Sequence, residues 1–310
     1  MAGIRAIIFD LDNTLWDVWP VIVRAEHAMH DFLARHYPRV TAQHDLRSMR
    51  DVRARMAIDH PAMRHDFTWL RLEALRQHAR EAAYPETMAD QAFEAFYRAR
   101  NEVTLYDDVR PALAALAPDY RLFALSNGNA DLSLCGIGQY FELGLAAREA
   151  GMLKPDPRIF GILLERAGLG ADEVVHVGDD AEADVEGARA AGVLPVWLNR
   201  QATPWPRESQ PPALTIRGLN ELAAPIAAQM LAAAGVPRRA AAQAKAFTPA
   251  RRGGGGELKV LWWQGPTILN PHLSIGVKDG DGSRIFYEPL ISFDAEGNFD
   301  WAAPDEELHG

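Results

Sequence analysis

The sequence predicts an α/β protein with a doubly wound parallel sheet, an inserted helical cap and an irregular C-terminal extension. Four short apolar runs predict the sheet, because each lacks polar alternation and ends in a polar turn, as strands buried on both faces do. These runs are residues 6–9, 122–125, 174–177 and 194–198. Helical patterns at 156–168 and 182–191 lie between the later runs, so right-handed crossovers are expected to join parallel strands.

The cap is predicted from the long interval between the first two strands. More than 100 residues separate these strands, and they have almost no strand character. Four helices are expected in this interval, at 18–35, 42–58, 66–83 and 86–102. Ordinary connections between strands are much shorter. We therefore expect a helical cap over 16–105, inserted into a sheet domain formed by 1–15 and 106–222.

The composition is that of a folded globular chain, because 48% of the 310 residues are hydrophobic and 24% are charged. No apolar run approaches the roughly 20 residues of a membrane helix, and Asp10 interrupts the apolar start before it could form a secretion signal. The lone cysteine, Cys135, excludes an intrachain disulfide and fits a reducing cytosol. The net charge of −10 includes no basic patch. We therefore expect a cytoplasmic protein that binds neither membranes nor nucleic acid.

The C-terminal part of the chain changes in composition. Residues 223–256 are rich in alanine and end in four consecutive glycines, which predicts a flexible linker. Residues 257–310 carry ten acidic and three basic residues. A segment of this length is a poor basis for an independent core without disulfides or a metal.

Two carboxylates follow the first predicted strand directly. Asp10 and Asp12 are separated by one residue, and ligands of open α/β sheets bind outside the carboxyl ends of the strands. One carboxylate there can attack as a nucleophile and form an aspartyl phosphate. The other can donate a proton to the leaving oxygen and later activate water. On its own, such a pair is equally typical of a surface turn.

Polar groups at other strand ends argue against a surface turn. Ser126 and Asn127 offer a hydroxyl and an amide to phosphate oxygens, and Lys154 offers a positive charge to a nucleophile and a phosphoryl group. Further carboxylates follow the strand at 174–177, namely Asp179, Asp180 and Asp184. A small set of hard oxygen ligands suits Mg²⁺, which keeps several waters and bridges to phosphate.

Four motifs at the ends of predicted strands, in this order, resemble the haloacid dehalogenase-like (HAD) superfamily over residues 4–222. The motifs are Asp10 with Asp12, Ser126 with Asn127, Lys154, and Asp179 with Asp180 and Asp184. The resemblance implies a Rossmann-like core, Mg²⁺ as cofactor and a small-molecule phosphate ester as partner. It implies that Asp10 is the nucleophile and a metal ligand, and that Asp12 is the general acid/base, with its main-chain carbonyl as a further ligand. The other implied roles are phosphate binding by Thr14, Ser126 and Asn127, orientation of nucleophile and phosphate by Lys154, and metal ligation by Asp179, with support from either Asp180 or Asp184.

Asp12 also distinguishes subclasses of the superfamily. The dehalogenases that this chain resembles lack a carboxylate at this position because halide leaves without a proton, whereas an alkoxide leaving group needs one. Asp12 therefore favours phosphate esters over haloacids. Hydrolysis of a C–P bond would need a cap lysine for Schiff-base chemistry, and residues 16–105 contain no lysine.

Longer stretches resemble one proteobacterial branch of the superfamily. These stretches are 15–16, 20–22 with 24–26, 126–130, 138–142 and 176–180. The branch dephosphorylates 5-amino-6-(5-phospho-D-ribitylamino)uracil in riboflavin biosynthesis and also hydrolyses FMN, so these two esters are the expected substrates. Sugar phosphates or nucleotides are the alternative. Substrate specificity is expected to lie in the cap. Four cap side chains could contact a flavin-like ring, although packing in the core or at the surface is favoured for each of them. These side chains are Trp16, Trp19, Trp69 and Arg71.

Two further signals concern other classes of site. Residues 257–310 resemble the truncated start of a periplasmic peptide-binding protein of an ABC transporter, so a peptide-binding module is the alternative from a different functional class. The segment is too short for a complete peptide-binding cleft. In the cap, His27 and His30 share a helix face, but no third ligand joins them at helical spacing. A solvated helix face is therefore favoured there over a metal site.

Overall fold

A computed structural model describes residues 3–222, 291–293 and 299–301 of the chain. The chain divides into two compact units, Met1–Ala240 and Ala241–Gly310. In the second unit, β7 (Ile291–Phe293) and β8 (Phe299–Trp301) form an antiparallel pair. The predicted linker over 223–256 lies outside the described residues. So does most of 257–310, and its relation to peptide-binding proteins stays a prediction.

The first unit is built on a six-stranded sheet in which every pairing is parallel. Its strands are β1 (Ala6–Phe9), β2 (Arg121–Ser126), β3 (Leu143–Ala146), β4 (Val174–Gly178), β5 (Leu194–Leu198) and β6 (Leu214–Ile216). Their spatial order is β3-β2-β1-β4-β5-β6, the order of a doubly wound Rossmann-like sheet. The predicted fold class is confirmed, and two edge strands, β3 and β6, join the four strands that the sequence predicts.

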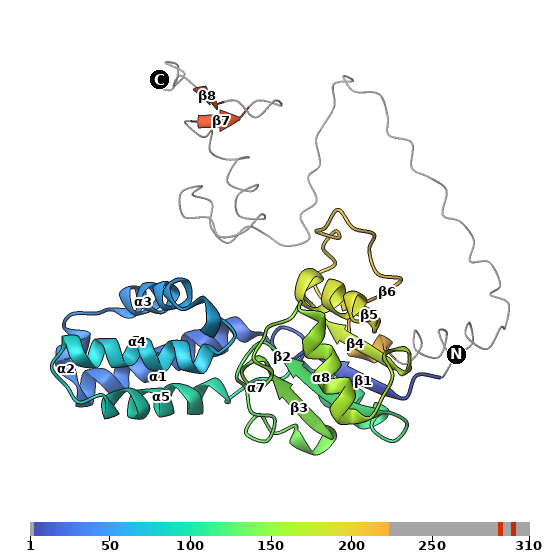
Figure 1. The fold of residues 1–310 in the computed structure, drawn as a ribbon, viewed down its shortest axis with the longest axis horizontal. Helices are drawn as coiled ribbons and strands as arrows, with labels where there is room; N and C mark the ends of the chain where they lie inside the picture. Colours follow the sequence, from blue (N-terminus) through green and yellow to red (C-terminus); the bar gives the residue numbers. More distant parts are fainter. Residues whose placement is uncertain (1–2, 223–290, 294–298, 302–310) are drawn as a thin grey trace, which may run out of the picture. The chain divides into compact units, whose positions relative to one another are not determined.

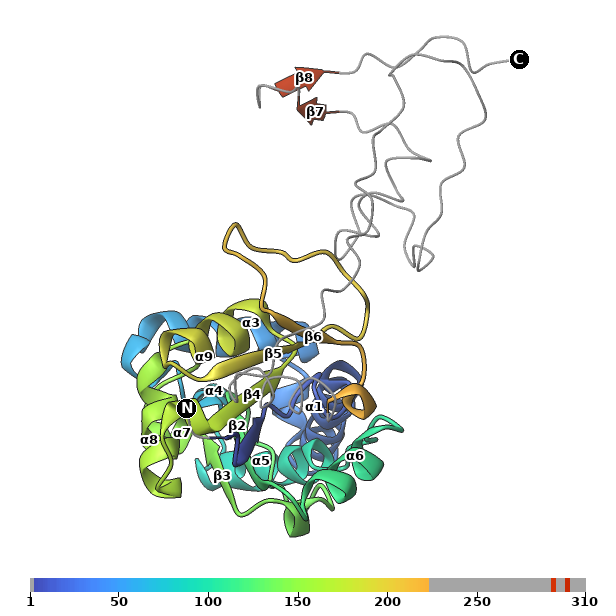
Figure 2. The same ribbon diagram turned by 90° about the vertical axis from the view of Figure 1, so that its right-hand side faces the viewer.

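Both faces of the sheet are covered by helices (Figure 2). Side chains of β1 alternate between the faces, as strand geometry requires. Ile7 and Phe9 pack in the cluster that contains α6 (Val109–Leu116), whereas Ala6 and Ile8 pack in the cluster that contains α8 (Pro157–Ala167) and α9 (Gly187–Ala190). All four side chains are fully buried. This two-sided burial explains why the strand is an unbroken apolar run.

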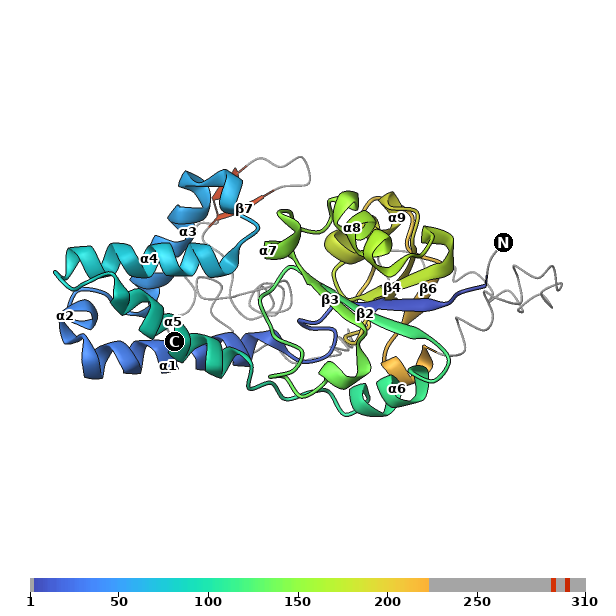
Figure 3. The ribbon, with the colours of Figure 1, turned by 60° about the horizontal axis from the view of Figure 1, so that its bottom comes forward.

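Except for α6, the helices between β1 and β2 form a separate region beside the sheet (Figures 1 and 3). They are α1 (Val18–His36), α2 (Pro38–Thr41), α3 (Leu46–Asp59), α4 (Phe67–Glu81) and α5 (Thr87–Arg100), with a short 3-10 turn η1 (Pro61–Met63). These helices share a hydrophobic cluster of their own, with Leu33, Leu75 and Phe96 among its buried members. The region therefore has a core that is separate from the two clusters of the sheet.

One helix of this region starts later than the sequence predicts. The pattern predicts a helix over 42–58, but α3 begins at Leu46. Asp45 explains the difference, because its side chain accepts a hydrogen bond of 2.8 Å from the backbone N–H of Ser48 and so caps the helix. Residues 42–45 belong to the turn that follows α2.

The remaining short elements lie between the strands of the sheet or, in the case of η5, after its last strand. They are η2 (Gly138–Tyr140), α7 (Ala147–Ala150), η3 (Ala171–Glu173), η4 (Ala181–Glu186) and η5 (Leu219–Glu221). The predicted helix over 182–191 is two pieces, a π-helical turn η4 followed by α9. Among the described residues, no helix is both long and apolar enough to cross a membrane.

Candidate active site

The site lies where β1 and β4 end side by side in the middle of the sheet. Asp10 directly follows β1 and Asp179 directly follows β4, and the two strands pair in parallel with Phe9 opposite Val177. The strand order reverses at this point. From β1 the chain adds β2 and β3 on one side of the sheet, and it then returns to add β4, β5 and β6 on the other side. Open α/β sheets bind ligands at such a reversal.

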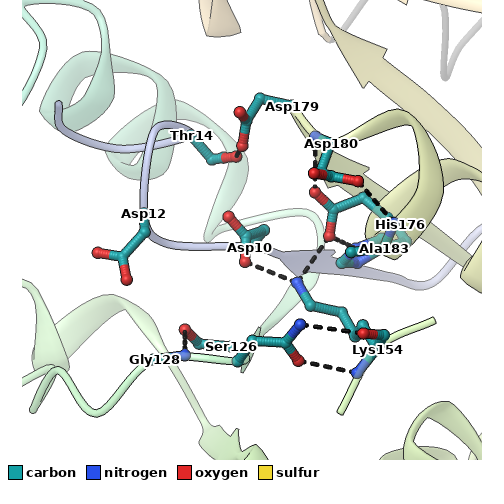
Figure 4. A network of polar contacts seen from close by, with 12 residues as sticks. Asp10, Asp12, Thr14, Ser126, Gly128, Lys154, His176, Asp179, Asp180 and Ala183 are labelled. Carbon is teal, nitrogen blue, oxygen red and sulfur yellow. Dashed lines mark hydrogen bonds and ion pairs between the residues drawn. The ribbon is translucent and has the colours of Figure 1, made fainter. Parts of the chain in front are cut away.

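A buried lysine joins two of the predicted carboxylates (Figure 4). Lys154 Nζ lies 2.6 Å from Asp10 Oδ1 and 2.6 Å from Asp184 Oδ1. Burial alone would lower the pKa of Lys154, but the charges and hydrogen bonds of the two carboxylates raise it above its usual value. His176, which is fully buried in β4, lies 3.0 Å from the same Asp184 oxygen through Nε2. The lysine therefore stays an ammonium beside the predicted nucleophile.

Asn127 holds the segment that carries this lysine. Its Nδ2 donates to the carbonyl of Lys154 at 3.0 Å, and its Oδ1 accepts from the N–H of Lys154 at 2.8 Å. The amide predicted to bind phosphate thus contacts the backbone of Lys154 in this structure. The neighbouring Ser126 is buried, and its Oγ accepts a hydrogen bond of 2.9 Å from the N–H of Gly128.

Asp179 is held close to the first motif by Thr14. The buried Thr14 hydroxyl donates to Asp179 Oδ1 at 3.3 Å. Burial, together with the charges of Asp184 and Asp180, raises the pKa of Asp179 to about 7. A hollow of about 280 Å³ opens beside Asp179, lined also by Tyr106.

The structure distinguishes Asp180 from Asp184. Ligand oxygens of Asp10, Asp179 and Asp184 all lie within 4.8 Å of one another. The Asp180 side chain instead accepts hydrogen bonds from the N–H groups of Glu182 and Ala183, so it caps the turn η4. Its own N–H donates to Asp184 Oδ2 at 3.0 Å. Asp184 is thus the member of the pair whose carboxylate joins the other two.

The donor set of this cluster fits a hard divalent cation. Three carboxylates face a single ammonium, so the ionised group is two positive charges short of neutrality, and an incoming phosphate ester adds further negative charge. Burial raises the pKa of Asp10 above its usual value, although the charge of Lys154 opposes the shift. A few oxygen ligands with room for water are what Mg²⁺ prefers.

Asp12 points away from the Asp10 carboxylate (Figure 4). Its carboxylate accepts two contacts from Arg100 Nη2, at 2.7 Å to Oδ1 and 2.8 Å to Oδ2, and one from Trp16 Nε1 at 2.9 Å. Arg100 is the last residue of α5 and is 1% exposed. Sequence reasoning missed this arginine, because a single arginine at the end of a helix has no pattern that marks it as part of a site.

The aromatic candidates of the helical region differ in their surroundings. Trp16 is fully buried, and Trp69 packs edge-on against His60 with ring centroids 5.1 Å apart. The Arg71 guanidinium lies 3.6 Å above the ring of Phe96. Trp19 is 64% exposed. Core or surface packing describes Trp19, Trp69 and Arg71 in this structure, whereas the buried Trp16 also donates to Asp12 through Nε1.

Comparison with known proteins assigns the family. The model of the haloacid dehalogenase-like hydrolase family matches residues 4–192. Because this match covers more than half of the chain, the chain belongs to that family. The predicted superfamily membership is therefore confirmed.

Particular relatives refine this assignment. The 5-amino-6-(5-phospho-D-ribitylamino)uracil phosphatase YigB of Escherichia coli (strain K12) is 32% identical over 204 residues, which is 64% of this chain and 84% of the relative. The phosphoserine phosphatase of Thermus thermophilus is 36% identical over 147 residues, or 46% of this chain and 59% of that enzyme. Together with the family match, these relatives identify the chain as a phosphatase among the HAD hydrolases.

A solved structure is also similar over most of its length. The crystal structure of a 2-haloacid dehalogenase from Pseudomonas syringae pv. Tomato DC3000 is 35% identical with a TM-score of 0.69, and the match covers 73% of this chain and 99% of that one. It supports the fold of the first unit.

Proposed function

We propose that this protein hydrolyses phosphate monoesters through an aspartyl-phosphate intermediate on Asp10. The observation that carries the proposal is the contact between the Asp10 carboxylate and Lys154 Nζ at 2.6 Å, at the carboxyl end of the central strand. The ammonium can orient the nucleophile and offset charge on an incoming phosphoryl group. Neutral substrates would not need so buried and so strongly paired a cation.

The proposed reaction has two steps, in which Asp10 acts as the nucleophile and Asp12 transfers protons. An Asp10 oxygen attacks phosphorus and the bond to the leaving oxygen breaks, which gives an acyl phosphate and an alcohol. Asp12 supplies the proton that the leaving oxygen needs, then accepts a proton from the water that attacks the acyl phosphate and releases inorganic phosphate. Because Asp12 is paired with Arg100 here, its carboxylate has to turn from α5 toward the ester before it can act.

We propose Mg²⁺ as the cofactor, held by Asp10 and Asp179 with the main-chain carbonyl of Asp12. When bound, it supplies positive charge that offsets the repulsion between the anionic nucleophile and the anionic ester. Asp184 acts through Lys154 and the N–H of Asp180, with which it forms hydrogen bonds. Thr14 keeps Asp179 in place, and Ser126 remains the candidate for direct contact with phosphate oxygens.

The proposed substrates are 5-amino-6-(5-phospho-D-ribitylamino)uracil and FMN. The support is the similarity to YigB, at 32% identity across 84% of that enzyme, and the short stretches of the motifs. Both esters carry a ribityl phosphate, so one site can accept either. Sugar phosphates and nucleotides are the alternative class of substrate. A place in riboflavin biosynthesis follows if the ribityl phosphates are preferred.

A second candidate activity is dehalogenation, which is favoured by the 35% identity to a structure described as a 2-haloacid dehalogenase. In that reaction Asp10 would displace halide from carbon, and no proton donor would be required. Asp12 counts against this reading, since a carboxylate at that position serves an oxygen leaving group.

The test measures phosphate release from FMN, the ribitylaminouracil phosphate, sugar phosphates and nucleotides, and chloride release from 2-chloropropionate, with and without Mg²⁺. Asp10→Asn should abolish phosphate release, whereas Asp31→Asn, the same change at an exposed site on α1, should leave it unchanged. A preference for sugar phosphates would keep the chemistry and overturn the substrate. Chloride release without phosphate release would overturn the proposed reaction.

A further inference from the structure

A second group of potential metal ligands lies in the helical region, outside the site described above. His44 precedes α3, while His78 and Glu81 lie in the last turn of α4. Ligand atoms of these three side chains lie within 4.8 Å of one another. Glu81 Oε2 faces both rings, at 3.0 Å from His44 Nε2 and 3.6 Å from His78 Nδ1. The two rings are 4.2 Å apart between centroids.

The two imidazoles lack the hydrogen bonds that buried polar groups ordinarily make. The side chain of His78 is 1% exposed, yet neither ring nitrogen has a hydrogen-bond partner among the described residues. His44 Nε2 is close to Glu81, but the approach does not have hydrogen-bond geometry, so this atom is also without such a partner. Buried polar atoms are nearly always satisfied, and an exception calls for a missing partner such as an ion.

We propose that His44, His78 and Glu81 form a binding site for a transition-metal ion of the Zn²⁺ type. Ligand atoms about 2.0–2.1 Å from a tetrahedral zinc lie about 3.3 Å from one another. The separations of 3.0 and 3.6 Å from Glu81 Oε2 bracket that value. Two imidazole nitrogens and one carboxylate oxygen also form a ligand set that zinc uses.

The chemistry of the ligands separates this site from the carboxylate cluster at the sheet. Imidazole suits Zn²⁺, Ni²⁺ and Cu²⁺, whereas oxygen-only sets suit Mg²⁺. Burial, with the neighbouring His44 acting in the same direction, lowers the pKa of His78 to about 4, so its ring is neutral at pH 7 as a metal ligand must be.

The surroundings of Glu81 support the same assignment. Gln77 Nε2 donates to Glu81 Oε1 at 2.7 Å, which leaves Oε2 free to face the histidines. Such a partner fixes the orientation of a ligating carboxylate. The Glu81 side chain is 39% exposed and that of His44 is 17% exposed, so one side is open for ion entry and for a water as fourth ligand.

A bound ion would fasten the start of α3 to the end of α4. Arg39 of α2 already donates to the carbonyls of Ala82 and Ala83, both at 2.8 Å, just after this turn of α4. Figure 1 shows α2 at the end of the helical region away from the sheet. The site therefore has a structural role in the helical region and is separate from the reaction.

The experiment titrates Zn²⁺ into the full chain, freed of metal by a chelator and then saturated with Mg²⁺ so that the oxygen site is occupied. Isothermal titration calorimetry should show one Zn²⁺ per chain, and Co²⁺ should give a visible ligand-field absorption that Zn²⁺ removes. Zn²⁺ should also raise Tm, because a ligand that binds the folded chain stabilises it.

His44→Gln and Glu81→Gln should each weaken Zn²⁺ binding by roughly 10-fold or more, since even partners behind the ligands contribute 10- to 100-fold. His27→Gln removes an exposed histidine of the same region and should leave the affinity unchanged. All three variants should keep Mg²⁺-dependent phosphate release, which also shows that they fold. Equal Zn²⁺ affinity in wild type and His44→Gln, or no binding in the presence of Mg²⁺, would overturn the proposal.

Discussion

Gly128 shows how closely the surroundings of a single residue are fitted at the active site. A Cβ at this position would lie 2.5 Å from Asp12 Oδ2 and 3.3 Å from Arg100 Nη2. The Asp12 carboxylate would have to move, because 2.5 Å is far inside van der Waals contact. We expect Gly128→Ala to lower kcat roughly 10- to 100-fold, since the methyl group would obstruct the space in which the Asp12 carboxylate moves between Arg100 and the ester, and a misplacement of about 1 Å in the reacting position has that effect. Steady-state phosphate release measures it.

Gly161 provides the control for this change. It lies in the exposed middle of α8, and a Cβ there would meet nothing within 4 Å. Gly161→Ala should leave kcat unchanged and raise the free energy of unfolding by about 0.5–1 kcal/mol, because alanine is the better helix former. Unaltered turnover in both variants would show that the position of Asp12 does not limit the reaction.

Single residues also show where sequence reasoning stops. Asp10 and Asp179 could be placed together because each follows a strand, and parallel strands bring their carboxyl ends to one edge. The choice between Asp180 and Asp184 depends on how η4 winds, and this turn is π-helical. Arg100 reaches Asp12 from 88 positions away, and no local pattern encodes so distant a contact.

At the scale of elements, the start of α4 links the helical region to the sheet. Asp66 Oδ1 caps this helix by accepting from the N–H of Trp69 at 2.8 Å, while Oδ2 lies 3.2 Å from Arg148 Nε of α7. Asp66→Ala should lower the free energy of unfolding by about 1 kcal/mol through the lost cap. It should also lower kcat/KM by at most about five-fold, because an ion pair with one exposed partner, here Arg148, contributes about 0.2–1 kcal/mol.

Two variants distinguish the loss of a helix N-cap from the loss of the ion pair between Asp66 and Arg148. Asp45→Ala removes the corresponding N-cap of α3, a helix that packs against α4 and α1, so it should lower stability alone. Arg148→Ala removes this ion pair and leaves Asp66 as the N-cap of α4, so it should reduce kcat/KM alone. Chemical denaturation and initial rates supply both readouts. A fall in kcat/KM for Asp45→Ala would instead attribute the effect to helix stability.

The elements that sequence reasoning missed have a common physical feature. β3 and β6 are edge strands of four and three residues, and each has exposed or half-exposed side chains. Their short sequences, Leu143–Ala146 with a glycine and Leu214–Ile216 with a threonine, carry little apolar signal. The four predicted strands are buried by neighbours on both sides, which is what makes their runs continuous. Strand pairing at the edges depends on tertiary contacts that a local pattern does not contain.

At the scale of the whole molecule, Asp108 couples distant parts of the first unit and makes stability depend on pH. It accepts from Arg200 at 2.9 and 3.0 Å and from the N–H of Leu219 at 2.8 Å, and Arg200 also donates to the carbonyl of Thr14. Burial raises the pKa of Asp108, but these hydrogen bonds and the Arg200 charge outweigh it, so the pKa is lowered.

The sign of the pH effect follows from this lowered pKa. A carboxyl with a lower pKa in the folded state adds stability at pH values above its unfolded pKa, and this stability is lost as pH falls through the folded pKa. Asp108→Asn should therefore cost about 1–2 kcal/mol at pH 7 and progressively less below pH 4. Urea unfolding of both proteins between pH 3 and pH 7 measures the difference. A constant difference across this range would mean that the ion pair does not contribute.

The first of the two compact units of the chain, Met1–Ala240, is expected to be sufficient for activity. Every proposed catalytic residue and all three hydrophobic clusters of the described residues lie between positions 4 and 222, inside the unit Met1–Ala240. A chain ending at Ala240 should therefore fold and keep Mg²⁺-dependent phosphate release, because it retains all of these residues. Its kcat/KM should stay within about two-fold of that of the full chain, which corresponds to about 0.4 kcal/mol. Initial rates and thermal unfolding of the two proteins test this. A large loss of activity in the shortened chain would assign the acidic segment 257–310 a part in the reaction, whereas equal rates and an unchanged Tm would leave the first unit as the complete phosphatase.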